Sequence, residues 1–208
     1  MIVDQPPTLH PYTALKVVLL SGLSDPATCA LSEQQMRFLE SLDAPEEAKV
    51  WWNFPYVVCS EPRRTPPLWL ASWRNTWQFF RASRNPYRDA ARRHWRALVE
   101  STERLLVITL SCGIEIVNHC VDASDVSRDI HLIALGPVAF RRPVLPHTLV
   151  QGKGDYLSKL FFRRPDVEIT GAGHMNYLHH PDVAQLCREL CNNTLRSSAA
   201  VSICHSAS

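Results

Sequence analysis

Three strongly apolar stretches constrain the fold of this chain more than any other feature of its sequence. They show little alternation between apolar and polar residues, and they occupy residues 17–20, 105–110 and 130–135. A strand with one solvated face would alternate, so these stretches predict strands that are buried on both faces, as in a parallel sheet. Weaker stretches occupy residues 50–54, 148–151 and 167–170, which brings the expected sheet to about six strands.

Segments with helical signals separate these strands. The first begins with a capping box, in which Ser32 and Gln35 each bond the backbone N–H of the other. The predicted helices cover residues 32–42, 86–101, 113–120 and 181–195. Strands that alternate with helices form a parallel sheet covered on both faces. We therefore predict an α/β fold, a three-layer sandwich with a mostly parallel sheet.

The length and composition fit one globular domain. The chain has 208 residues, of which 46% are hydrophobic and 20% charged, and its formal net charge is +2. We expect a single domain over residues 1–196 and a disordered tail over residues 197–208, where small and polar residues have little to bury. The first residues have neither the length nor the flanks of a signal peptide or a membrane span, which favours a soluble, cytoplasmic protein.

The cysteines predict reduced thiols. There are seven, an odd number without framework spacing, although a bridge between Cys191 and Cys204 stays open. We expect no metal or other cofactor, because paired metal-binding spacing is missing among the candidates His119, Cys120, His179, His180, Cys187 and Cys191.

Positive charge is concentrated in residues 63–104, which contain ten arginines and three acidic residues. No recognition motif accompanies them and the whole chain is nearly neutral, so nucleic acid is not an expected partner. One interpretation is a solvated helix face. The other is a docking patch for an acidic carrier protein or the phosphates of coenzyme A, formed by Arg88, Arg92, Arg93 and Arg96.

An aromatic stripe marks residues 55–84, which do not fit the alternating pattern. Trp69, Trp73 and Trp77 recur at every fourth position and share one face of a helix. The stripe is interpreted either as a helix packed on the core or as a lid or wall of an acyl pocket, since pockets are lined mostly by apolar and aromatic groups.

Three polar residues follow predicted strands in turn-like sequence. Ser111 lies between Thr109 and Gly113, where a strand passes into a helix. Such a sharp bend strains the central residue and needs small residues two positions to either side. Asp155 and His174 follow two later strands in glycine-rich turns. Open α/β sheets place ligands at the carboxyl edge of their strands, so these side chains are expected to meet there.

This order of residues resembles the α/β-hydrolase family over most of the chain, on the motifs Thr109-x-Ser111-x-Gly113, Gly152-x-x-Asp155 and Gly171-x-Gly173-His174. The resemblance implies that Ser111 attacks a carbonyl, that His174 takes and returns its proton, and that Asp155 orients the imidazole. It also implies an oxyanion hole formed by the backbone N–H groups of Cys112 and Leu23.

The chain departs from the family in three respects. Thr109 stands where glycine is usual. The stretch before the first strand is too short for the family's first two strands, so a minimal six-stranded version is expected. Residues 136–146 are too few for the cap that family members usually insert there, so any cover over the site is expected from residues 55–84.

Three other residues are further candidates for the chemistry. Cys112 is disfavoured as the nucleophile, because Leu110 and Ile114 would occupy the positions that need small residues. Glu115 is interpreted as a supporting or solvated group, and Asp125 is the alternative acid.

The sequence thus predicts a serine hydrolase that cleaves an ester or thioester through a Ser-His-Asp triad and an acyl-enzyme. One alternative is a thioesterase or acyltransferase that acts on carrier-bound or coenzyme A-bound acyl groups. The other is a hydrolase-like protein that only binds a ligand. The acyl group, the leaving group and the oligomeric state are not predicted.

Overall fold

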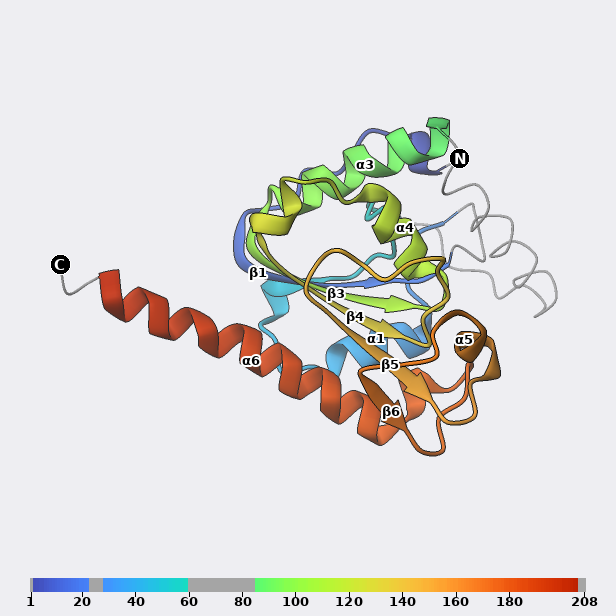
Figure 1. Ribbon diagram of the computed structural model, residues 1–208. Helices are drawn as coiled ribbons and strands as arrows, with labels where there is room; N and C mark the ends of the chain where they lie inside the picture. The colour runs from blue at the N-terminus through green and yellow to red at the C-terminus, as the bar shows by residue number, and fades with distance from the viewer. Residues whose placement is uncertain (1, 23–27, 60–84, 206–208) are drawn as a thin grey trace.

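A six-stranded parallel sheet forms the centre of the protein, in a computed structural model that describes residues 2–22, 28–59 and 85–205 (Figure 1). The strand order is β2-β1-β3-β4-β5-β6, and every neighbouring pair is parallel. The strands are β1 (Thr13–Leu20), β2 (Lys49–Val50), β3 (Thr102–Leu110), β4 (Asp129–Leu135), β5 (His147–Gly152) and β6 (Val167–Ile169). The predicted fold class is confirmed.

Helices cover both faces of this sheet (Figure 1). On one face lie α3 (Asn85–Val99) and α4 (Gly113–Cys120), and on the other lie α1 (Glu33–Glu40) and α6 (Pro181–His205). The short α5 (Tyr156–Phe161) follows β5. Single 3-10 turns complete the described elements: η1 (Ile2–Asp4), η2 (Glu46–Ala48), η3 (Asp125–Ser127) and η4 (Tyr177–His179).

Each sheet face has its own apolar core. Trp95 of α3 and Ile114 of α4 pack on one face, whereas Phe38 of α1 and Val183 of α6 pack on the other. The central strands supply side chains to both cores, because successive residues of a strand point to opposite faces. This accounts for their apolar sequence, which lacks alternation.

The capping box predicted at the start of α1 is present. Gln35 N–H donates to Ser32 Oγ at 3.3 Å, and Ser32 N–H donates to the Gln35 side chain at 2.8 Å. Two backbone groups of the first helical turn, which have no partner within the helix, are satisfied in this way. The local sequence therefore fixes where this helix begins.

The strand order reverses direction at β1, which pairs with β2 on one side and β3 on the other. The carboxyl ends of β1 and β3 therefore border the crevice at which open α/β sheets bind ligands. Ser111 directly follows β3 at this crevice.

Two elements differ in length from the prediction. Strand β2 ends at Val50, four residues earlier than expected. Helix α6 continues to His205 and so includes part of the segment for which a disordered tail is predicted; its carboxyl end extends away from the sheet (Figure 1). No residue between Pro181 and the end of the chain is another proline or a glycine, so no local signal stops this helix.

The bridge between Cys191 and Cys204 stays a prediction, because the Cys204 side chain lies outside what the structure describes. Within the described ranges, no helix is long and apolar enough to cross a membrane.

Candidate active site

Ser111 lies at the bend between β3 and α4 in a strained backbone conformation. Its φ angle is 53°, in the left-handed region that residues other than glycine seldom adopt. The next strand holds it there, because Ser111 N–H donates to Leu135 C=O at 3.1 Å, and Val138 N–H donates to Ser111 C=O at 3.2 Å. Strand β4 and the loop after it thus fix the position of the serine.

Two residues flank this bend: at Gly113 there is no room for a side chain, whereas at Thr109 a side chain fits. A Cβ atom on Gly113 would lie 2.3 Å from the backbone oxygen of Leu20, so the close approach of α4 to β1 requires glycine. Thr109 is fully buried, and its hydroxyl has no hydrogen-bond partner in the part of the chain that the structure describes. The bend accommodates the threonine but leaves its hydroxyl unpaired.

The structure brings Ser111, His174 and Asp155 together in one hydrogen-bonded chain. His174 Nε2 lies 2.9 Å from Ser111 Oγ. His174 Nδ1 lies 3.0 Å and 2.9 Å from the two carboxylate oxygens of Asp155. These distances allow proton transfer between the serine and the imidazole without any rearrangement.

Asp155 is fully buried and accepts hydrogen bonds from three groups. Besides His174, it accepts from Ser158 N–H at 2.9 Å, as the N-cap of α5, and from the Tyr177 hydroxyl at 2.7 Å. Burial alone would raise the pKa of Asp155, but these three donors outweigh it and lower the pKa below its ordinary value. The group is therefore a carboxylate at neutral pH and can stabilise an imidazolium.

Tyr177 is the functional neighbour that the sequence analysis missed. Its buried hydroxyl donates to Asp155 and accepts from Gly152 N–H at 2.7 Å, so it ties the acid to the end of β5. Burial, with a further contribution from Asp155, raises the pKa of this phenol. Gly136 makes room for the pair, because a Cβ atom there would lie 2.6 Å from the Tyr177 ring and 2.7 Å from Asp155. No local motif marks a tyrosine for this role.

The first part of the loop after β1, where the resemblance implies an oxyanion donor, is held by a buried asparagine. Ser21 N–H donates to Asn53 Oδ1 at 2.9 Å, and Asn53 Nδ2 donates to Ser21 C=O at 3.3 Å. Asn53 N–H also donates to Cys29 C=O at 2.7 Å, so one residue fixes both ends of the loop. Leu23, the second expected donor, lies outside the described residues, whereas Cys112 is the N-cap of α4 beside Ser111.

The surroundings of the other three candidates, Cys112, Glu115 and Asp125, do not suit the roles of nucleophile or acid. Burial raises the pKa of the Cys112 thiol to about 11, which suppresses the nucleophilic thiolate. Glu115 is not solvated: it is buried, and it contacts His119 at 3.1 Å and accepts from Phe140 N–H at 3.3 Å. Asp125 accepts from the Trp95 indole at 2.9 Å beyond the far end of α4, so it is no alternative acid for His174.

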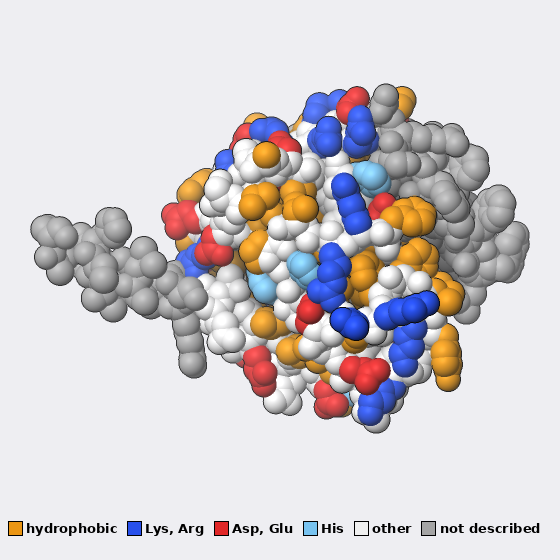
Figure 2. All heavy atoms as spheres, viewed as in Figure 1, with side chains coloured by type: hydrophobic (Ala, Val, Ile, Leu, Met, Phe, Trp, Pro, Cys, Tyr) orange, Lys and Arg blue, Asp and Glu red, His pale blue; other side chains and the backbone are white. Residues whose placement is uncertain are grey.

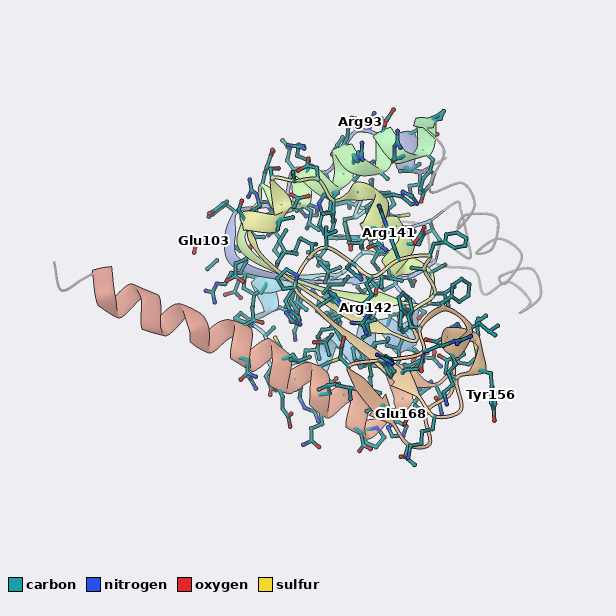
Figure 3. All side chains as sticks on the ribbon, in the orientation of Figure 1. Arg93, Glu103, Arg141, Arg142, Tyr156 and Glu168 are labelled. Atoms are coloured by element: carbon teal, nitrogen blue, oxygen red, sulfur yellow. The ribbon has the colours of Figure 1, made fainter. Side chains whose placement is uncertain are left out.

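Three arginines of helix α3 have partners within the fold. Arg88 forms an ion pair with Asp89 at 3.9 Å. Arg92 donates to His119 C=O at 3.0 Å, and Arg96 forms an ion pair with Asp122. Arg93 is exposed like Arg92 and Arg96, but its side chain has no hydrogen bond or ion pair with the described residues (Figure 3). Two arginines of the patch predicted for an acidic partner therefore connect α3 to the end of α4 instead.

Trp69, Trp73 and Trp77, with most of the 55–84 segment, lie outside the described residues. Across residues 2–22, 28–59 and 85–205, no three His, Cys, Asp or Glu side chains are grouped closely enough to hold a metal ion.

No protein-family model and no curated protein sequence matches this chain. Among solved structures, 15 chains match. One is described as the crystal structure of esterase PE8; it is 14% identical, the match covers 90% of this chain and 96% of that one, and the TM-score is 0.49.

Proposed function

We propose that this protein is a serine hydrolase that cleaves an ester or thioester through an acyl-enzyme intermediate. One observation carries the proposal: Ser111, His174 and Asp155 form a continuous hydrogen-bonded chain at the carboxyl edge of the sheet. The strained φ angle of Ser111 supports the proposal, because nucleophiles held at a sharp strand-to-helix bend commonly have a strained backbone of this kind.

The acylation step follows from this geometry. With its proton on Nδ1, His174 donates to Asp155 and accepts the hydroxyl proton of Ser111 at Nε2. The serine oxygen then bonds to the substrate carbonyl carbon, while His174 takes the proton and the carbonyl oxygen becomes an oxyanion. The Cys112 N–H at the start of α4 is the proposed donor to that oxyanion, aided by the positive end of the helix dipole.

The intermediate then collapses. The bond to the leaving alcohol or thiol breaks, and His174 returns its proton to that group. Water attacks the acyl-serine next, giving one proton to His174. The bond between the acyl carbon and Ser111 Oγ then breaks, and His174 returns that proton to Ser111 Oγ, which releases the acid and restores the starting enzyme. Throughout, the buried Asp155 carboxylate stabilises the imidazolium and keeps the required tautomer.

The test is covalent labelling with a fluorophosphonate probe, followed by hydrolysis of a panel of esters and thioesters. The wild-type protein should be labelled at Ser111, and Ser111→Ala should not be labelled. His174→Ala and Asp155→Asn should each lower kcat by roughly 10⁴-fold, the scale seen for other serine-histidine-acid triads. Ser127→Ala is the matched control, since this exposed serine lies far from the triad in sequence and structure and should label like the wild type.

Labelling that persists in Ser111→Ala would show that another residue is the nucleophile. Labelling at Ser111 without turnover of any ester or thioester would instead favour a protein that binds an acyl ligand. Full activity in Asp155→Asn would exclude the assigned acid.

A further inference from the structure

Five large apolar side chains are exposed around the candidate active site. Four of them are strongly exposed: Phe140 by 70%, Tyr156 by 79%, Leu160 by 81% and Met175 by 74%. The fifth, Leu157, is exposed by 44%. We call these five residues the apolar rim. Exposed apolar residues that occur singly are ordinary, but a group of this kind marks an interaction site.

The rim is built on the same segments as the triad. Tyr156 directly follows Asp155, and Met175 directly follows His174. The Phe140 ring packs edge-on against Phe161 of α5, with ring centroids 6.3 Å apart. The rim therefore lies at the edge of the sheet where Ser111 lies, and not at the opposite edge.

Six cations lie on the two segments that also carry Phe140, Tyr156, Leu157 and Leu160 of the rim, namely the connections from β4 to β5 and from β5 to β6. Figure 2 shows Lys and Arg side chains gathered beside hydrophobic ones on this face, and Figure 3 shows Arg141, Arg142 and Tyr156 on it. Lys159 joins the two groups, because its ammonium lies 6.0 Å from the centre of the Tyr156 ring. We call the following six residues the basic border: Arg141, Arg142, Lys153, Lys159, Arg163 and Arg164.

Only two members of the basic border have acidic partners within the described chain. Arg142 pairs with Asp166 at 3.2 Å, and Lys159 pairs with Glu168 at 3.7 Å. Arg141 donates to Asn118 C=O at 3.0 Å. The side chains of Lys153, Arg163 and Arg164 have no hydrogen bond or ion pair with the described residues, which leaves them available to anions outside the protein. Positive charge beside exposed apolar groups is the combination that binds anionic lipid, whose headgroups attract the cations while its acyl region receives the apolar side chains.

The shape of the rim favours a lipid surface over a partner protein. Four of the five rim side chains are exposed by 70% or more, and side chains so exposed protrude from the surface. Three surface grooves, of about 260, 320 and 630 Å³, contain no residue of the apolar rim, although the two larger ones are lined in part by residues of the basic border. A partner helix needs a groove for its apolar face, whereas protruding side chains enter a fluid bilayer directly.

We propose that the apolar rim and the basic border dock this protein on an anionic phospholipid surface. Docking would hold the carboxyl edge of the sheet against the lipid, so the substrate class would be the ester of a membrane lipid. The substrate assignment rests on the proposed hydrolase function, but the docking does not.

The test is co-sedimentation of the full chain with vesicles of phosphatidylcholine, with and without phosphatidylglycerol. It is done in Ser111→Ala, so that binding is measured without hydrolysis and apart from the identity of the nucleophile. Binding is expected only with phosphatidylglycerol. Adding Tyr156→Ser with Leu160→Ser should weaken it roughly tenfold or more, and adding Arg163→Glu with Arg164→Glu should weaken it by a similar factor.

The matched control adds Leu9→Ser with Tyr12→Ser. It changes the same two residue types, which are 91% and 65% exposed just before β1, at the opposite edge of the sheet. This control should bind like its parent. Absence of binding to phosphatidylglycerol vesicles, equal binding to phosphatidylcholine alone, or an equal loss in the control would each overturn the proposal. Docking that persists while the wild type fails to hydrolyse esters would refute the proposed function and leave the docking surface standing.

Discussion

Replacing Tyr177 by phenylalanine tests how Asp155, the proposed catalytic acid, is supported. The change removes one hydroxyl that is hydrogen bonded at 2.7 Å both to the Asp155 carboxylate and to Gly152 N–H. A bond to a charged acceptor contributes about 1.5–3 kcal/mol, and a buried N–H left without a partner costs about 1–3 kcal/mol. Because the two effects overlap, we expect the free energy of unfolding to fall by about 2–4 kcal/mol.

The pH dependence of this loss identifies its origin. The pKa of Asp155 is lowered in the folded protein, so bonds to its carboxylate stabilise the fold above the unfolded-state pKa of about 4. That contribution disappears as the pH falls through the lower folded-state pKa. The difference between wild type and Tyr177→Phe should therefore be constant near neutral pH and shrink below about pH 4.

Urea unfolding over a pH series measures both quantities. Tyr12→Phe is the control, because its side chain is 65% exposed and it should change stability by less than about 0.5 kcal/mol. If Tyr177→Phe lowered the free energy of unfolding no more than Tyr12→Phe does, the Tyr177 hydroxyl would not support Asp155. A larger loss that does not change with pH would show that the Asp155 charge is not involved.

Three further perturbations test other parts of the site. Gly113→Ala should destabilise the protein by about 3 kcal/mol or more, because its Cβ would lie 2.3 Å from a backbone oxygen. Gly154→Ala is the control: its Cβ would meet the nearest atom at 3.2 Å, so it should lower the melting temperature clearly less. Equal melting temperatures for the two variants would contradict the close packing of α4 on β1. Asn53→Ala leaves both backbone groups of Ser21 unpaired, so it should lower the free energy of unfolding by about 2 kcal/mol. Because these bonds hold the start of the loop after β1, the change should also slow fluorophosphonate labelling. Unchanged labelling would show that Asn53 does not support the site. Cys112, with a pKa of about 11, should be a thiolate in roughly one molecule in 10⁴ at pH 7. It should therefore resist alkylation by iodoacetamide until urea unfolds the protein, as measured by the mass of the peptide that contains it. Rapid alkylation of Cys112 in the native protein would refute its burial.

The sequence predicted the positions of the strands and of helices α1, α3, α4 and α6, because these depend on local patterns, but it did not predict the short α5. Apolar stretches that lack alternation mark doubly covered strands, and the Ser32 capping box marks where α1 begins. The carboxyl termini of α3 and α4 were also close to prediction. The length of α6 was not, since its end depends on what the helix meets and no local residue stops it.

The sequence by itself determined which strand ends carry the serine, the aspartate and the histidine, because glycine-rich and strained turns have local signatures. Only the tertiary structure decided what surrounds them. The hydroxyl of Tyr177 on Asp155, the burial of Glu115 and the distance of Asp125 from His174 all depend on contacts between segments far apart in the chain. Such contacts are selected by the packing and register of the whole sheet, and no short stretch of sequence encodes them.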